Sequence, residues 1–232
     1  MIRSHQIPLN LNLRDDAVFD NFLVGQNAPC LHALKNSVMQ RDEQFIYCYG
    51  DSGVGRTHLL QACCHLANEN KQSVFYLPLS THSDFSPAIF ESLETMSLVC
   101  IDDIDAVIGN KIWEEALFHF YNRARDCNVT LIVSAALSPQ QLPCVLNDLH
   151  SRLCWGLSLE IKHLNDSEKM QALQMRAASR GIQLPNEVVH YFISHYSRNM
   201  HDLLNMLDKL DRASLIAKRK ITVPFLKLIM QE

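Results

Sequence analysis

The sequence lacks the features that define several specialised classes of protein. Among its 232 residues there is no run of about 18 apolar residues, the length that a transmembrane helix needs, and residues 1–12 contain no secretory signal. Its 7 glycines and 8 prolines are too few for a collagen-like or linker-rich chain. The net charge is −4, so the sequence has no excess of basic residues of the kind typical of dedicated duplex-DNA binders. We therefore expect a globular cytoplasmic protein without a membrane partner.

The 8 cysteines lack the spacings of a metal or redox site. None of them forms a Cys-x-x-Cys pair, and the 11 histidines do not lie at zinc-finger distances from them. Cys48 and Cys100 lie in strand-like apolar runs, and Cys63 and Cys64 lie in a helical pattern. We expect these cysteines to be small buried apolar side chains in a cytoplasmic protein.

Short apolar runs rich in β-forming residues alternate with helical patterns. The predicted strands are 45–49, 74–77, 98–101, 130–134 and 157–161, and the predicted helices between them are 57–70, 85–95 and 111–127. The first four strands are almost continuously apolar, as strands are when both faces of a sheet are covered. The alternation predicts an α/β domain in which a five-stranded parallel sheet carries helices on both faces.

Beyond about residue 161 the pattern is helical to the end of the sequence. One helix is expected to begin at Asp166, another near Pro185, a third from about 200 to 218, and a last one with Pro224 in its first turn. We therefore divide the chain into an N-terminal peptide (1–14), an α/β domain (15–161) and a small α-helical domain (162–232).

The segment Gly50-Asp-Ser-Gly-Val-Gly-Arg-Thr57 follows a predicted strand and precedes a predicted helix. It matches the phosphate-loop pattern G-x-x-x-x-G-K-[ST], except that Arg56 replaces lysine. In such a loop, the backbone N–H groups converge on phosphate oxygens at the N-terminus of the following helix. Thr57 would supply a hydroxyl group for Mg²⁺. A glycine-rich turn without a ligand is the alternative. The predicted nucleotide-binding residues here are Gly50, Asp51, Ser52, Gly53, Val54, Gly55, Arg56, Thr57 and His58.

Two carboxylates end the third predicted strand. Asp102 and Asp103 follow the apolar run 98–101, at the sheet edge where the phosphate loop also lies. Asp102 would hold Mg²⁺ through water, and Asp103 would polarise an attacking water. An acidic pair after a strand is otherwise a turn or a helix cap.

These motifs, with three flanking segments, resemble the DnaA-type AAA+ ATPases. Phe19–Asn27 is similar to the opening box of that family, Asp102–Ile104 to its Walker B segment, and Ser151–Leu157 to the box that carries its arginine finger. The resemblance covers about residues 15 to 220. It implies an AAA+ α/β domain followed by a helical lid, with ADP or ATP bound between them together with Mg²⁺.

The resemblance also implies roles for single residues. Phe22 and Val24 would contact the nucleotide, and Ser134 would sense its γ-phosphate, although a strand-end serine can equally cap a turn. Arg152 would be the finger, pointing out of this chain into the nucleotide site of a neighbour, with a plain surface arginine as the alternative. In the lid, Arg198 and His201 would face the nucleotide, and His201 stands where the family has an arginine.

Two departures from DnaA narrow the resemblance. The sequence ends after the lid, where DnaA continues into a DNA-binding domain. In place of DnaA's long N-terminal region stand Gln6, Ile7, Leu9 and Leu11, similar to the short peptides that dock on the sliding clamp of DNA polymerase III. A disordered tail or an edge strand is the alternative for this peptide.

The resemblance then implies a regulator of bacterial replication initiation. On the clamp, such a protein stimulates hydrolysis of the ATP bound to DnaA and so produces inactive DnaA-ADP. Because Arg56 and His201 replace residues suited to a γ-phosphate, we expect weak intrinsic hydrolysis and a site that holds nucleotide, ADP in particular.

Other functions stay open at this point. A helicase-loader-like or DnaA-like ATPase would act on its own nucleotide and form stable homo-oligomers. A DNA-binding module would use the nucleotide only as a switch. The basic cluster Lys218–Lys220 could touch DNA beside the clamp, although cations at a helix C-terminus are more often solvated. We expect contact with DNA to be mainly indirect, through the clamp.

Overall fold

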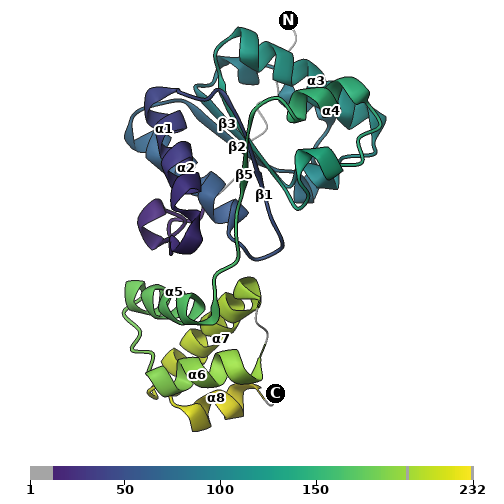
Figure 1. Cartoon of the computed structure of the whole chain (residues 1–232). Helices are drawn as coiled ribbons and strands as arrows, with labels where there is room; N and C mark the ends of the chain where they lie inside the picture. Colours follow the sequence, from purple (N-terminus) through teal and green to yellow (C-terminus); the bar gives the residue numbers. More distant parts are fainter. Residues whose placement is uncertain (1–12, 197–198, 231–232) are drawn as a thin grey trace, which may run out of the picture.

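The computed structural model of the protein describes residues 13–196 and 199–230. It contains a parallel sheet covered by helices and a separate helical unit toward the C-terminal end (Figure 1). The strands are β1 (Phe45–Tyr49), β2 (Val74–Pro78), β3 (Leu98–Asp102), β4 (Thr130–Ala135) and β5 (Leu157–Glu160). They form a 5-stranded sheet in the order β2-β3-β4-β1-β5, and every pair is parallel. The predicted fold class is therefore confirmed.

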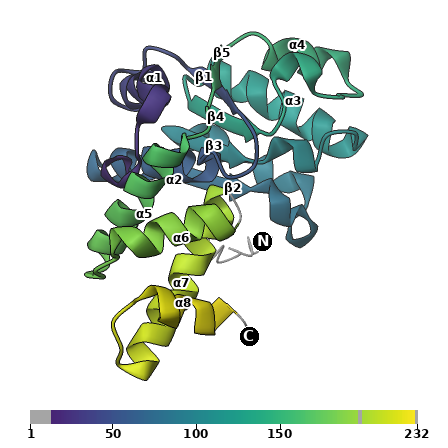
Figure 2. The same cartoon turned by 60° about the horizontal axis from the view of Figure 1, so that its bottom comes forward.

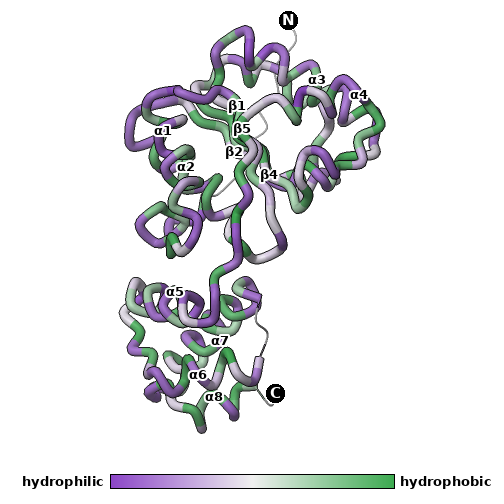
Figure 3. The backbone as a smooth tube through the Cα atoms, in the orientation of Figure 1, coloured by the Kyte–Doolittle hydropathy of each residue, from purple (hydrophilic) through white to green (hydrophobic). Residues whose placement is uncertain are grey.

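Helices cover both faces of the sheet. Side chains that alternate along β1 enter two different cores, because successive residues of a strand point to opposite faces. Ile46 and Cys48 pack with α1 (Ala28–Gln40) and α2 (Arg56–Glu69), whereas Tyr47 packs with α3 (Lys111–Asp126) and α4 (Asn147–Leu153). Figure 3 shows the apolar strands in the centre of this domain, between the more polar outer helices.

The C-terminal unit is built from helices alone. They are α5 (Asp166–Ser179), α6 (Asn186–His195), α7 (Met200–Ala217) and α8 (Val223–Met230). They share a core of their own that includes Leu173, Phe192 and Leu207, all fully buried. Helix α5 and the N-terminal end of α7 face the α/β domain (Figures 1 and 2). This unit is the expected lid.

Asn165 marks the point where the chain enters the lid. Its side chain accepts a hydrogen bond from the N–H of Glu168, and the Glu168 carboxylate accepts one from the N–H of Asn165. Such a capping box satisfies two helix-end donors at once. The helix expected from Asp166 is thus confirmed, and its cap is the residue before it.

The helix predicted over 85–95 is wrong. The structure has two short 3-10 turns there, Pro87–Phe90 and Leu93–Thr95, separated by Ser92 in the left-handed region at φ 68°. The apolar periodicity that suggested a helix is real, because Phe90 and Leu93 are buried, but a residue in the left-handed region cannot continue a helix. Further 3-10 turns are Phe19–Asn21, Gly25–Asn27, Leu79–Asp84, Ile104–Ala106 and Pro139–Gln141.

The cysteines differ in burial. All eight are free, and Cys30, Cys48, Cys63, Cys64 and Cys100 are buried as apolar side chains in the core beside α2. Cys127 is exposed, because it lies in the turn after α3. Within the described ranges, no helix is long and apolar enough to cross a membrane.

Candidate functional site

The phosphate loop joins β1 to α2 at the carboxyl edge of the sheet. Gly53 and Gly55 have φ values of +84° and +101°, which side chains rarely adopt. A Cβ on Gly53 would lie 2.3 Å from Oδ1 of Asn199 in the lid, and a Cβ on Gly55 would lie 2.7 Å from the ring of Phe22. The glycines therefore allow the lid and the N-terminal segment to approach the loop closely.

Arg56 is held within the loop by an acidic partner. Its Nη2 donates a hydrogen bond to Oδ1 of Asp103 over 3.2 Å, and its side chain is only 13% exposed. Its Nη1 is buried and has no hydrogen-bond partner among the described residues. A buried guanidinium donor without an acceptor is costly, so this nitrogen fits an anionic ligand such as a phosphate.

Asp102 and Ser134 form a buried network at the ends of β3 and β4. The Tyr76 hydroxyl donates to Oδ2 of Asp102 over 2.8 Å, and the Ser134 hydroxyl donates to Oδ1. The Ser134 oxygen also accepts a hydrogen bond from the N–H of Asp103 over 3.0 Å. Ser134 thus bridges the two acidic residues. Residues more than thirty positions apart in sequence meet here because β3 and β4 are neighbours.

Asp103 faces the phosphate loop. Burial raises its pKa to about 6, the charge of Asp102 contributes in the same direction, and Arg56 opposes the shift. A carboxyl group with this pKa exchanges a proton near neutral pH.

A cavity of about 310 Å³ lies between the loop, the N-terminal segment and the lid. It brings together the predicted residues Phe22, Ser52 to His58, Asp103 and His201. The complete lining is Arg14, Asn21, Phe22, Leu23, Ser52, Gly53, Val54, Gly55, Arg56, Thr57, His58, Asp103, His163, Leu164, Lys169, Ala172, Arg176, Met200, His201 and Leu204. Its size is that of a small-molecule site.

Some predicted residues lie outside this lining. The predicted residues Val24, Gly50, Asp102 and Ser134 do not line the cavity. Asp51 points instead to His163, whose Nε2 lies 3.0 Å from its Oδ2. Arg198 lies outside the described residues, as do the peptide residues Gln6, Ile7, Leu9 and Leu11.

His58 forms part of the cavity wall in its neutral form. Its Nε2 donates to the carbonyl oxygen of Val18 over 2.8 Å, and its ring lies 5.5 Å from that of Phe22. Burial lowers the pKa of His58, which favours the uncharged imidazole. The contact ties the phosphate-loop helix to the opening box.

Among the cavity residues that sequence reasoning missed, those with ionisable side chains are Arg14, His163, Lys169 and Arg176. Arg14 precedes the opening box, and the other three belong to the lid and its entry. No motif marks these positions, because their place in the cavity depends on how α5 packs against the N-terminal segment.

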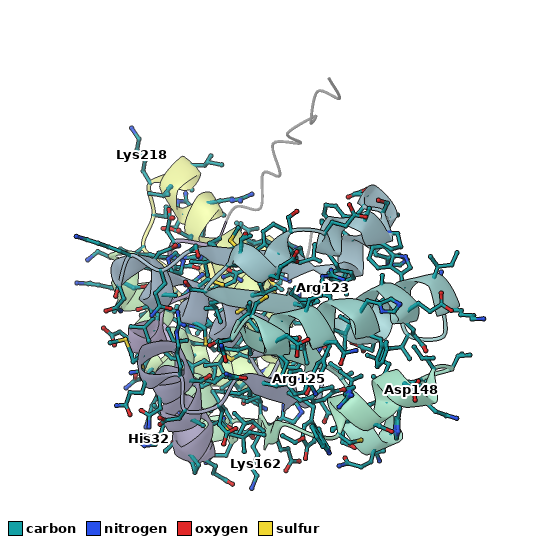
Figure 4. All side chains as sticks on the ribbon, turned by 90° about the horizontal axis from the view of Figure 1, so that it is seen from above. His32, Arg123, Arg125, Asp148, Lys162 and Lys218 are labelled. Carbon is teal, nitrogen blue, oxygen red and sulfur yellow. The ribbon has the colours of Figure 1, made fainter. Side chains whose placement is uncertain are left out.

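Arg152 lies on α4, away from the cavity. Its guanidinium stacks over the ring of Trp155, 5.3 Å from the centroid, and Trp155 is 72% exposed. Both residues border a surface hollow together with Phe118, Asp148 and Ser151. Figure 4 shows Asp148, on the same helix, projecting outward at the edge of the molecule. Arg152 itself is half-buried; it borders this surface hollow and does not line the cavity of its own chain.

Taken together, the fold and the site define an AAA+ nucleotide-binding module: a phosphate loop after β1, acidic residues after β3, and a helical lid over the loop. The family model for the bacterial DnaA ATPase domain matches residues 13–160, and the model for the Hda lid domain matches residues 166–230. The chain belongs to the DnaA-type AAA+ family, and its lid identifies it as a protein of the Hda kind.

Solved structures agree in fold. Domain III of the Thermotoga maritima replication initiation protein DnaA is 21% identical, with a TM-score of 0.83 over 95% of this chain and 98% of that one. AMPPCP-bound DnaA from Aquifex aeolicus is 21% identical, with a TM-score of 0.72 over 86% of this chain and 66% of that one, so this chain spans about two thirds of its length. The Thermotoga maritima RuvB branch migration motor is 19% identical, with a TM-score of 0.70 over 94% of this chain and 72% of that one.

Proposed function

We propose that this replication regulator binds an adenine nucleotide, docks on the sliding clamp of DNA polymerase III and stimulates hydrolysis of the ATP bound to DnaA. The product of its action is inactive DnaA-ADP. The observation that carries the proposal is the position of Arg152 at a surface hollow that is separate from the cavity of its own chain. An arginine in that position can serve the nucleotide of a partner.

The nucleotide would lie in the cavity under the lid. The glycines of the loop and the unpaired Nη1 of Arg56 fit a phosphate group. Thr57 and Asp102 are the residues that would hold Mg²⁺, which neutralises phosphate charge. The similar DnaA from Aquifex aeolicus binds AMPPCP, which supports an adenine nucleotide here.

Arg152 would act on DnaA-bound ATP. Charge moves toward the leaving group during phosphoryl transfer, and a guanidinium supplied by a neighbouring protein stabilises that charge. Trp155 holds the guanidinium at the surface in a stacked position. Within its own site the chain has Arg56 paired with Asp103, an arrangement that favours holding a nucleotide over hydrolysing it.

Contact with DNA would be mainly indirect, through the clamp. The basic cluster 218–220 follows α7, and Lys218 projects outward at the edge of the lid (Figure 4). Cations at this position are stabilised by the C-terminal end of the helix dipole without any ligand.

The test is an assay of DnaA-ATP hydrolysis with and without DNA-loaded clamp. Replacing Arg152 by Ala should reduce the stimulation by on the order of 10³-fold, as for other arginine fingers, while nucleotide binding and thermal stability stay near normal. Arg152→Lys should restore little of the stimulation, because the planar guanidinium group is lost. Arg212→Ala, which removes an exposed arginine from α7, is the matched control and should stimulate fully.

Two outcomes would contradict the proposal. One is full stimulation by the Ala variant of Arg152. The other is fast ATP turnover by the isolated chain together with a stable homo-oligomer, which would favour an ATPase acting on its own nucleotide.

A further inference from the structure

An ion-pair cluster joins the N-terminal segment to the lid at the wall of the cavity. The Asp16 carboxylate pairs through Oδ2 with Nη2 of Arg176 on α5, and Nη2 of Arg180 lies 3.9 Å from the same oxygen. Nε of Arg14 lies 3.3 Å from the other oxygen, Oδ1. The Asp16 carboxylate is therefore paired with arginines from two separate parts of the fold, the N-terminal segment and the lid.

Arg176 is the buried member of this cluster. The residue is only 9% exposed, it lines the cavity, and its Nε is buried without a hydrogen-bond partner among the described residues. Asp16 fixes Nη2 and thereby the plane of the guanidinium. The hydrogen bond from Arg176 and the charge of Arg14 also bring the pKa of Asp16 below its ordinary value, against the effect of burial.

A buried guanidinium N–H that lacks an acceptor is a costly arrangement, and at a cavity wall it indicates a ligand acceptor atom. The nucleotide proposed for this cavity carries such acceptors on its base, its ribose and its phosphates. His201, on α7, stands where the family has an arginine. Arg176 brings a guanidinium group into the cavity from a different lid helix, α5.

We propose that Arg176 is a nucleotide-binding residue supplied by the lid, and that Asp16 is the residue that positions it. The inference rests on the proposed binding of adenine nucleotide in this cavity. It implies that the segment directly following the N-terminal peptide takes part in closing the lid over the nucleotide. Asp16 lies in that segment, and its carboxylate pairs with Arg176 of the lid.

The experiment is calorimetric titration of ADP into the full chain. Arg176→Met should weaken ADP binding by at least about tenfold, the value of a hydrogen bond from a charged donor. Asp16→Asn should weaken it less, because Nε remains but loses its fixed orientation. The double variant should bind no more weakly than Arg176→Met alone, since Asp16 acts through Arg176.

The matched control is Asp15→Asn, which removes the same charge from the exposed neighbouring residue and should leave ADP affinity unchanged. Arg176→Lys tests whether weaker binding by the Met variant results only from misfolding. The lysine keeps a positive charge beside Asp16 but lacks the Nε donor, so this variant should also bind ADP more weakly than the wild type.

Hydrogen exchange separates positioning from a merely structural role. In the wild type, ADP should slow amide exchange at residues 13–18 as well as at the loop 50–58. In Asp16→Asn the slowing should persist in the loop and disappear at 13–18.

Wild-type ADP affinity in both Arg176 variants would overturn the inference and leave the proposed function intact. Fully additive losses in the double variant would overturn the positioning role of Asp16. Absence of ADP binding by the wild type would overturn both the inference and the nucleotide binding on which it rests.

Discussion

Arg56 replaces the usual lysine of a phosphate loop, and its side chain extends to Asp103. A lysine is a compact point charge, whereas an arginine is a planar fork that pairs with a carboxylate through one edge and keeps donors on the other. In this chain the Asp103 carboxylate takes Nη2, and Nη1 stays unpaired. The pair therefore links the phosphate loop to Asp103, the carboxylate expected to activate water.

We predict from this that the isolated protein binds ADP at least as tightly as ATP. A γ-phosphate would approach the Asp103 carboxylate and compete with it for Arg56, whereas a diphosphate need not. Arg56→Lys should shift the ratio of affinities toward ATP. Calorimetry with each nucleotide measures both, and a clear wild-type preference for ATP would contradict the prediction.

Glu114 is a second residue whose role follows from its partners. It is fully buried on α3, and its carboxylate accepts hydrogen bonds from the N–H groups of Gly109, Val145 and Leu146 over 2.7, 3.1 and 2.6 Å. Leu146 is the residue that precedes α4, so Glu114 holds the start of the helix that carries Arg152.

Glu114→Gln should therefore destabilise the fold and displace α4. A glutamine offers one acceptor oxygen in place of two and turns an N–H₂ group toward a backbone donor, a loss of about 1–3 kcal/mol for each buried donor left without a partner. Denaturant unfolding measures the loss. Glu115→Gln, at the exposed next position, is the control and should have little effect.

At the scale of elements, the lid depends on how α5 begins. The capping box of Asn165 and Glu168 satisfies two backbone donors at the point where the chain leaves the α/β domain. Asn165→Ala should lower stability by about 1 kcal/mol, the usual value of an N-cap. It should also weaken nucleotide binding, because α5 carries Lys169 and Arg176 to the cavity.

Thermal unfolding and ADP titration test this prediction together. Ser167→Ala, an exposed change within the same helical turn, is the control. Equal stability of the Asn165 and Ser167 variants would show that the cap contributes nothing.

The N-terminal peptide belongs to the same scale, although its residues 1–12 lie outside the described residues. Gln6→Ala combined with Leu11→Ala should abolish binding to immobilised clamp. The thermal stability of the protein should be retained, because the first core residue, Ala17, comes after the peptide. Surface plasmon resonance measures the affinity. Unchanged clamp binding would show that this peptide is not the clamp-binding segment.

At the scale of the molecule, two separate cores share one ligand cavity. The α/β domain and the lid are each packed around their own apolar residues, and the cavity is lined by both. ADP at one hundred times its dissociation constant should stabilise the native state by about 2.7 kcal/mol, since it binds only the folded form. AMP at the same concentration should stabilise less, because the loop is built to hold a β-phosphate as well. Identical midpoints with and without ADP would contradict a site between the two units.

Much of the architecture could be predicted from local patterns. The four continuous apolar runs indicated strands covered on both faces, and β3 is buried along its whole length. The helix predicted over 111–127 forms as α3, because its apolar residues recur with helical period. By contrast, α1, which follows the opening box, was not predicted, and α4 has only 7 residues, too few for a periodic signal.

The site was predictable only as far as its motifs extend. Gly53, Gly55 and Thr57 were identified because their spacing has a geometric meaning on its own. The family resemblance implied that Ser134 senses a γ-phosphate, and its hydrogen bond to Asp102 was found only in the structure. Asp16 carried no signal, since an acidic residue near a terminus is ordinary until a buried arginine is found against it.

The sequence by itself determined the alternation of strands and helices, the phosphate loop and the acidic strand end, because hydrophobic period and glycine spacing act over a few residues. Only the tertiary structure decided which distant residues share the cavity. Arg14, Lys169 and Arg176 come together because α5 packs back against the segment before the opening box, a contact between residues about 160 positions apart that no local pattern encodes. It also decided that Arg152 lies apart from the cavity, on a helix whose first residue follows a backbone N–H group held by the buried Glu114.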